Sequence, residues 1–255
     1  MKIFAIGTGI ASPSDLPTQA TVLQSKPSFR KASLNMKLAF FAMNAALKEA
    51  GLDSSQLESA GFVLGSSYGE LVQTKEFLKA WAKEKLARPL LFQSSLHNGT
   101  LGFLSLEFGL RGPSFTVSHQ YLTGEKALEL GMDLIADQAA EICFISAVEV
   151  MDPDLLPSLQ CKMPEGVQWV DGAACLILAS EVWVIRNQPE LAFEINRLEY
   201  HQSSGSFSGS YYDSDGLEKI IMAMKAAKKN TKDETHEAKF LKRDGFESKI
   251  EWRCS

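Results

Sequence analysis

Residues 112–124 read GPSFTVSHQYLTG, and this stretch decides the fold. An apolar run ends at a corner of small and hydroxyl-bearing residues, and the next segment, EKALELGMDLIADQ, has the apolar spacing of a helix. In many α/β enzymes, a strand that turns sharply into a helix carries the nucleophile. This corner instead holds Ser118, His119, Gln120 and Tyr121, none of which is an obvious nucleophile.

The segments on either side of the corner alternate between strands and helices. Apolar runs predict buried strands in KIFAIGTGI, GFVLG, SFTV, EICFISAVEV and AACLILASEV. The segment LNMKLAFFAMNAALKEAGL has helical apolar spacing and predicts a helix that ends at Gly51. Because the strands are apolar throughout rather than alternating, we predict an α/β fold with a mixed, mostly parallel five-stranded sheet covered by helices on both faces.

The character of the sequence changes after Glu181. ELAFEINRLEY is compatible with another strand, HQSSGSFSGSYYDSDG is a polar loop, and GLEKIIMAMKAAKKN predicts a helix closed by lysines. The last segment, TKDETHEAKFLKRDGFESKIEWRCS, is dense in charge and weakly patterned. It is predicted to be either a small appendage or a loosely ordered tail.

Composition limits the class of protein. The 255 residues are 45% hydrophobic and 22% charged, which is ordinary for a globular protein. A formal net charge of −5 argues against nucleic-acid binding, which needs a basic face. No apolar run approaches the roughly 20 residues that span a bilayer, and the N-terminal segment is too broken by glycine for a signal peptide. We therefore expect a soluble, cytoplasmic protein.

The cysteines and histidines give no metal-site pattern. The four cysteines lack CxxC spacing, and Cys143 and Cys175 lie in apolar runs, where reduced thiols pack well. The histidines, which also lack metal-ligand spacing, are His97, His119, His201 and His236. GTGIAS lacks the third glycine of a dinucleotide-binding loop. We expect neither a metal nor a nucleotide cofactor.

The corner residues leave alternatives open. His119 is either a hydrogen-bonded structural group or a local acid or base. Tyr121 would act as a nucleophile only if the pKa of its phenol were strongly lowered, and the nearest cation in the sequence is Lys126, about one helical turn onward. Otherwise Tyr121 is a bulky plug.

The order of these segments resembles the β-ketoacyl synthases, which have the thiolase-like fold, over roughly residues 1–225. KIFAIGTGIASP is similar to their first strand and turn, and FVLGSSYGE to their second, glycine-rich strand end. SLHNGTLGFLSLEFGLRGPSFTV is similar to the segment before their nucleophile, and VDGAACLILASE to the last strand of their N-terminal half. The four motifs are specific because they occur together in the family's order.

The resemblance implies that catalytic residues are missing. In the family the corner carries a cysteine at the start of a helix, where the backbone N–H groups favour a thiolate. Counting from Gly112-Pro113 or back from Thr123-Gly124 places that cysteine position at Tyr121. The family's second half supplies two catalytic histidines, and no HGT-type motif follows here. The Cys-His-His residues are therefore absent, and condensation by the family mechanism is excluded unless a partner chain supplies them.

The resemblance also gives a domain division. Residues 1–185 correspond to the thiolase-like N-terminal half, 186–230 to a remnant of the start of the second half, and 231–255 to the charged tail. The helices at Leu101–Leu110 and Ala127–Ile135 should be buried, so an isolated half would expose an apolar face. We expect a homodimer or tetramer, formed by a second copy that replaces the missing half, by the family's subunit contact through SFTV, or by both.

Three functions remain open. The first is a non-catalytic pseudo-ketosynthase that binds an acyl thioester, either acyl-CoA or acyl-carrier protein, in a tunnel. The second is a partner of an active ketosynthase, comparable to chain length factors. The third is a thioesterase or decarboxylase of altered chemistry. In the first reading the ligand or its phosphopantetheine would contact His97, Asn98, His119, Gln120, Tyr121 and Thr123.

Overall fold

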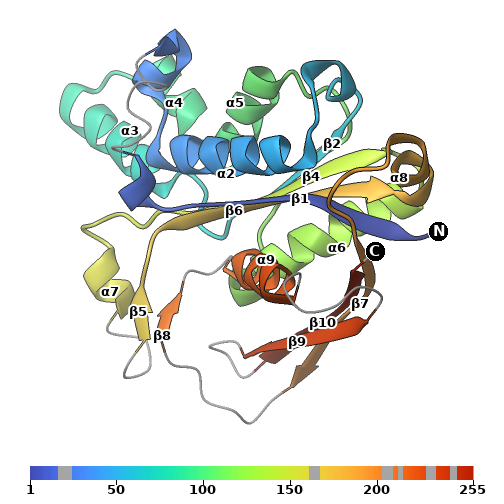
Figure 1. Ribbon diagram of the computed structural model, residues 1–255. Coiled ribbons are helices and arrows are strands. Elements are labelled where there is room, and N and C mark those ends of the chain that lie inside the picture. Colours follow the sequence, from blue (N-terminus) through green and yellow to red (C-terminus); the bar gives the residue numbers. More distant parts are fainter. Residues whose placement is uncertain are drawn as a thin grey trace.

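The computed structural model describes residues 1–16, 25–160, 167–202, 209–211, 215–227, 234–241 and 246–254. Its main sheet has eight strands in the order β3-β2-β4-β6-β1-β7-β10-β9, not the five predicted (Figure 1). Their bounds are β1 (Ile3–Ala11), β2 (Gly61–Gly65), β3 (Ser114–Val117), β4 (Ile142–Glu149), β6 (Gly172–Ser180), β7 (Phe193–Gln202), β9 (Thr235–Leu241) and β10 (Phe246–Cys254). A separate two-stranded sheet pairs β5 (Val167–Trp169) with β8 (Gly209–Tyr211).

The sheet is mixed. β2 pairs in parallel with β3 and with β4, whereas β6 pairs antiparallel with both β4 and β1. β7 continues the sheet antiparallel to β1, and β10 and β9 follow in antiparallel order. Because helices cover both faces of β4 and β6, these strands are apolar throughout, and their sequences do not distinguish the two pairing directions.

Helices lie on both sides of the sheet (Figure 1). On one side α2 packs against the sheet, and on the other side α6 and α9 do so. The helix bounds are α2 (Leu34–Ala50), α3 (Leu71–Glu84), α4 (Pro89–Ser94), α5 (Gly99–Phe108), α6 (Thr123–Ala136), α7 (Leu156–Gln160), α8 (Glu181–Asn187) and α9 (Gly216–Ala227). In the described part of the chain, no helix has the length and apolar content of a membrane span.

α2 shows how local sequence sets an element and its packing. Its N-cap Ser33 accepts a hydrogen bond from the backbone N–H of Met36, and Gly51 ends it at a positive φ of 65°. The helix then lies very close to β1, where a Cβ on Gly9 would be 2.0 Å from the carbonyl oxygen of Ala42. Glycine in β1 therefore permits the contact between strand and helix.

The segment predicted to be a charged tail forms part of the main sheet. β9 and β10 pair with each other, and β10 pairs with β7. Their inner face contributes Ile250 and Trp252 to the core beneath α9. Their outer face carries paired charges, with Lys249 Nζ 2.7 Å from Glu237 on β9 and 2.9 Å from Glu251 on the same strand. A face of paired charges is stable in water without another layer.

The prediction that a second copy must cover the helix at 127–135 is wrong. Leu128 and Ile135 of α6 are fully buried within this chain, because they pack with Leu217 of α9 and Trp252 of β10 in one apolar cluster. α5 was predicted to be buried, but most of it is not. Its buried residues are only Thr100 and Leu104, so much of its apolar surface faces solvent.

Candidate functional site

The corner between β3 and α6 is a strained turn. The chain leaves β3 at Val117, passes through a 3-10 turn at Gln120–Leu122, and begins α6 at Thr123. Gln120 has a φ of 48°, in the left-handed region that a residue with a side chain rarely adopts. The strain therefore falls on Gln120, one residue before Tyr121.

Two hydroxyl groups hold the turn in this conformation. Thr123 Oγ1 donates to the Gln120 carbonyl at 2.7 Å and accepts from the His119 backbone N–H at 2.9 Å. Ser67, in the loop after β2, donates its hydroxyl to the same Gln120 carbonyl at 3.0 Å. The two hydroxyl oxygens are 2.7 Å apart. This network offsets the strain at Gln120 and joins the turn to the loop after β2.

Thr123→Val is expected to destabilise the protein by about 1 kcal/mol, because the His119 N–H loses its side-chain acceptor and the Gln120 carbonyl keeps only the Ser67 hydroxyl. The matched control is Thr116→Val in β3. The Thr116 hydroxyl is buried and makes no hydrogen bond, so its removal should be neutral or stabilising. Urea unfolding of both variants measures the difference. Equal stability of the two variants would contradict the role given to Thr123.

A buried carboxylate occupies the backbone donors beside the turn. Glu149, at the end of β4, is fully buried and accepts from the backbone N–H groups of Ser67 and Tyr68, the latter at 3.3 Å. In acyl-transfer enzymes, backbone N–H groups at such a position stabilise an oxyanion. Here they donate to Glu149, so they are not free to donate to a bound ester.

The structure brings most of the predicted site residues together. His119 and Gln120 are exposed, Tyr121 is half-buried and Thr123 is buried, all within the turn. His97 lies against the loop after β2, since a Cβ on Gly69 would be 2.4 Å from its Nδ1.

Asn98 faces a different space from the turn. It lines a cavity of about 410 Å³ between α4 and α5. Apolar residues of that cavity include Leu90, Phe103 and Leu106. The predicted site is therefore divided between the turn and this cavity.

Aromatic side chains fill space next to the turn. Tyr68, which follows Ser67, packs its ring on Trp169 with centroids 5.8 Å apart. Trp169 and Met151 form a small buried cluster, which Leu156 and Leu159 of α7 extend. Sequence reasoning missed this cluster because its members come from four separate segments. Side chains of the chain itself thus occupy the apolar volume beside Tyr68.

Glu70 was also missed by sequence reasoning. Its side chain is buried, and its Oε1 accepts from the hydroxyls of Ser33, at 2.7 Å, and Thr100. Burial raises the pKa of the Glu70 carboxyl, although the hydrogen bonds from Thr100 and Ser33 oppose the shift. The only sequence signal was a glutamate after the glycine-rich strand end, which is ordinary for a loop.

Glu70→Gln is expected to become more stabilising, relative to the wild type, as pH rises. A raised pKa in the folded state means that the carboxyl's contribution is complete below the unfolded pKa of about 4.3 and is lost as pH rises through the folded pKa. Glutamine keeps an acceptor but does not titrate. Urea unfolding at several pH values from 4 to 8 measures the trend, with exposed Glu58→Gln as the control. A pH-independent difference would contradict the assignment.

The buried cysteines are not suited to act as nucleophiles. Burial raises the pKa of the Cys143 thiol to about 12 and raises that of Cys175 well above its usual value. Both thiols are therefore protonated at neutral pH and unreactive. Among the described residues, no three His, Cys, Asp or Glu side chains gather in a way that would hold a metal ion.

Large apolar side chains are exposed on α3, α4, α5 and their connections, and we call them the apolar face: Leu78, Trp81, Leu86, Leu90, Phe92, Leu96 and Leu106. Phe115 of β3 is also exposed, but it is in register with Val63 and so lies on the α6 side of the sheet. Leu106 is 87% exposed. β3 is the edge strand of the sheet and pairs only with β2 in the described structure. Exposed apolar side chains beside an edge strand are typical of a protein interface.

Two of the three comparisons with known proteins find similar proteins. The family model "Beta-ketoacyl synthase, N-terminal domain" matches residues 16–156, which is more than half of the chain. No curated protein sequence matches.

Solved structures with similar folds include a type II polyketide synthase ketosynthase in complex with its acyl-carrier protein (AntDE:AntF; TM-score 0.78, 14% identity). They also include the ishigamide ketosynthase/chain length factor (0.75, 13%). In both cases the match covers 100% of this chain and 99% of the other. A third is a ketosynthase in complex with its chain length factor from Xenorhabdus doucetiae (ApeO and ApeC). This match has a TM-score of 0.62 and 15% sequence identity, and it covers 99% of each chain. These likenesses confirm the thiolase-like fold.

Proposed function

Because the chain belongs to the β-ketoacyl synthase family, we propose that it is a non-catalytic, chain-length-factor-like partner of an active ketosynthase. The observation that carries this proposal is the apolar face next to β3, whose outer edge pairs with no strand among the described residues. The family resemblance assigns the subunit contact to the segment SFTV, and that segment is β3. A heterodimer would bury the apolar face and pair the edge strand at the same time.

The chemistry of the turn supports a partner rather than a catalyst. Tyr121 stands at the nucleophile position, Glu149 occupies the nearby backbone donors, and Cys143 is too buried to act. The Tyr68–Trp169 packing fills space beside the turn. The active ketosynthase would supply the cysteine and both histidines, and this chain would shape the space that receives the growing acyl chain on acyl-carrier protein.

The experiment is co-expression with a ketosynthase whose gene neighbours the gene for this chain, followed by native mass spectrometry. A 1:1 heterodimer is the expected result, with condensing activity in the complex and none in this chain alone. If the two proteins co-purify with no defined stoichiometry, the proposal is wrong. It is also wrong if this chain forms only a homodimer that does not bind the ketosynthase. Hydrolysis of acyl-CoA by this chain, lost in Tyr121→Phe, would instead favour an enzyme of altered chemistry.

Direct binding of an acyl thioester is the second candidate. Its support is the cavity of about 410 Å³ at Asn98, which has mainly apolar walls and lies beside exposed Lys31. Native mass spectrometry of the free chain with acyl-CoAs of increasing length tests it. Binding of one acyl-CoA per chain, with an optimum acyl length, would support this candidate. If no acyl-CoA binds at any length, only the partner role remains.

A further inference from the structure

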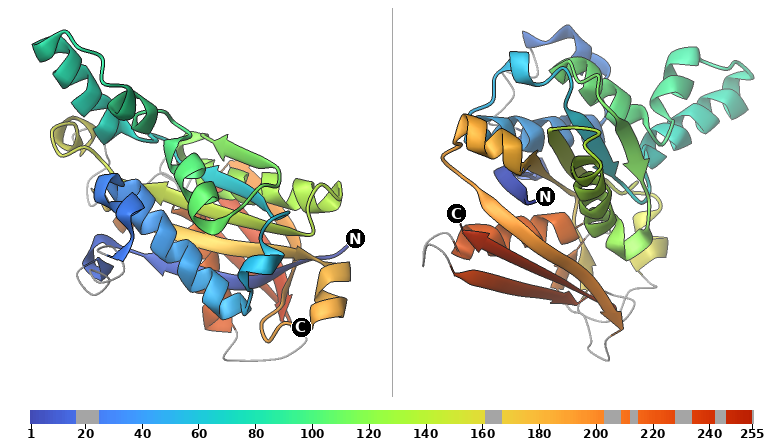
Figure 2. Two further views of the ribbon diagram at one scale, coloured as in Figure 1. Left: turned by 90° about the horizontal axis from the view of Figure 1, so that it is seen from above. Right: turned by 90° about the vertical axis from the view of Figure 1, so that its right-hand side faces the viewer.

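α3 and α4 form a hairpin that projects from the body of the molecule (Figure 2). Neither helix contains a buried residue. Thr74 donates its hydroxyl to the Ser95 carbonyl at 3.0 Å, and the rings of Phe77 and Phe92 are 5.5 Å apart. These contacts join the two arms of the hairpin to each other. The direction in which the hairpin points therefore depends on how α3 is attached to the body.

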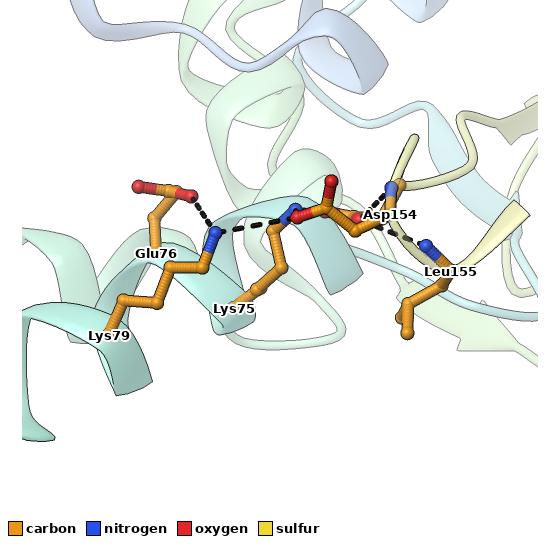
Figure 3. A network of polar contacts seen from close by, with 6 residues as sticks. Lys75, Glu76, Lys79, Asp154 and Leu155 are labelled. Carbon is orange, nitrogen blue, oxygen red and sulfur yellow. Dashed lines mark hydrogen bonds and ion pairs between the residues drawn. The ribbon is translucent and has the colours of Figure 1, made fainter.

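Leu71 and Val72, at the start of α3, pack on apolar clusters of the body. Further along α3, the helix is attached by an ion pair with the loop between β4 and α7 (Figure 3). Lys75 Nζ contacts the Asp152 carboxylate and is 2.8 Å from Asp154 Oδ2. The Asp152 side chain is fully buried and that of Lys75 is only 21% exposed. Opposite charges with so little solvent between them interact more strongly than a surface pair does. Lys79, by contrast, is mostly exposed and reaches Asp154 at 3.5 Å.

Asp152 is itself held firmly. Its Oδ1 accepts from the backbone N–H groups of Asp154, at 2.8 Å, and Leu155, at 3.3 Å, just before α7 begins. The preceding residue, Met151, donates its N–H to Asp171 at 3.0 Å, and Asp171 also accepts from the Trp169 indole at 2.9 Å. One carboxylate thus orders the loop with one oxygen and binds α3 with the other.

We propose that Lys75 and Asp152 are positioning residues, whose ion pair fixes the direction of the α3–α4 hairpin so that its apolar side chains meet the partner subunit. The inference rests on the proposed function. A hairpin held in one direction loses little conformational freedom on binding, whereas a loosely attached hairpin must be ordered at the cost of affinity. Sequence alone gave no sign of this pair, since the two residues are far apart in the chain.

Hydrogen–deuterium exchange of the free chain tests the attachment without any partner. Lys75→Met keeps the length of the side chain and removes its charge. It is expected to speed exchange of residues 71–96 at least tenfold, while the strands of the main sheet exchange as in the wild type. Lys79→Met is the matched control, and its exchange rate for residues 71–96 should stay within twofold of the wild-type rate. Equal exchange in Lys75→Met and Lys79→Met would overturn the proposal.

Because Lys75→Met leaves a buried carboxylate without its cation, a second variant separates positioning from stability. Lys75→Met with Asp152→Asn removes both charges and should recover most of the thermal stability, yet the hairpin should still exchange quickly. Slow exchange in this double variant would mean that the effect was one of stability only. Lys75→Arg, which preserves the charge, should behave as the wild type.

Affinity for the co-expressed ketosynthase is the second readout. Both Lys75→Met and the double variant should bind it at least tenfold more weakly than the wild type does, and Lys79→Met should not. Faster exchange with unchanged affinity would overturn the positioning role. If the wild type binds no ketosynthase, the proposed function fails, and the exchange measurement still decides whether the ion pair fixes the hairpin.

Discussion

Leu106→Arg is expected to weaken the heterodimer with a ketosynthase by roughly 100-fold, or about 3 kcal/mol, and to leave the free chain folded. Leu106 lies on α5 and is 87% exposed, so its replacement removes little packing from the free chain. Arginine is also a good helix former. In the complex, the same position would place a charge within an apolar interface without a partner for it.

The matched control is Ile185→Arg on α8, where an apolar side chain that is 69% exposed lies away from the hairpin (Figure 1). Circular dichroism should show both variants folded. Titration of each variant with the ketosynthase, read by biolayer interferometry, should show a loss only for Leu106→Arg. An equal affinity of both variants would place the interface elsewhere on the molecule.

Gly9→Ala is expected to destabilise the chain by about 3 kcal/mol or more and to make it largely insoluble. The added Cβ would lie 2.0 Å from the Ala42 carbonyl oxygen and 2.8 Å from the Ala46 nitrogen. Both are backbone atoms of α2 and cannot rotate away. α2 would have to move off β1, which would open the core on that side of the sheet.

Gly102→Ala is the control for the same substitution. Gly102 lies inside α5, and a Cβ there meets nothing within 4 Å. Alanine favours a helix over glycine by up to about 1 kcal/mol, so this variant should be as stable as the wild type or more stable. Soluble yield and urea unfolding compare the two variants. A soluble Gly9→Ala variant of wild-type stability would mean that β1 and α2 are less closely packed than described.

The sequence allowed the centre of the fold to be predicted because its strands are apolar throughout. β2, β4 and β6 are buried on both faces, so each reads as a continuous apolar run. The helices α2 and α6 were predicted from their spacing, and α2 also from its terminal glycine. The corner between β3 and α6 was found from the same signals.

The strands beyond β7 were missed for a physical reason. In β9 and β10 only every second side chain faces the core, so charged residues such as Lys249 alternate with apolar ones such as Ile250. Because the segment was judged by its high charge content, the alternation of apolar and charged residues, with its period of two, was not recognised. Had the alternation been counted, it would have predicted two half-buried strands and a cover for α6.

The candidate site was only partly accessible from sequence. The turn residues are contiguous, so His119, Gln120, Tyr121 and Thr123 could be grouped by inspection. That Gln120 carries the strain depends on hydroxyls from a distant loop, and such contacts follow only from the tertiary structure. The same holds for Glu149, which ends β4 and accepts from the backbone N–H groups of Ser67 and Tyr68 in the loop after β2.

The place of β1 in the sheet affects how the protein is made. The strand β1 pairs along its length with β6 and at its start with β7, so its partners are residues 173–180 and 193–195. On the ribosome, β1 must wait until most of the polypeptide has emerged before it can pair. Folding is therefore expected to be slow, and the nascent chain exposes an unpaired apolar strand to chaperones until β6 has emerged.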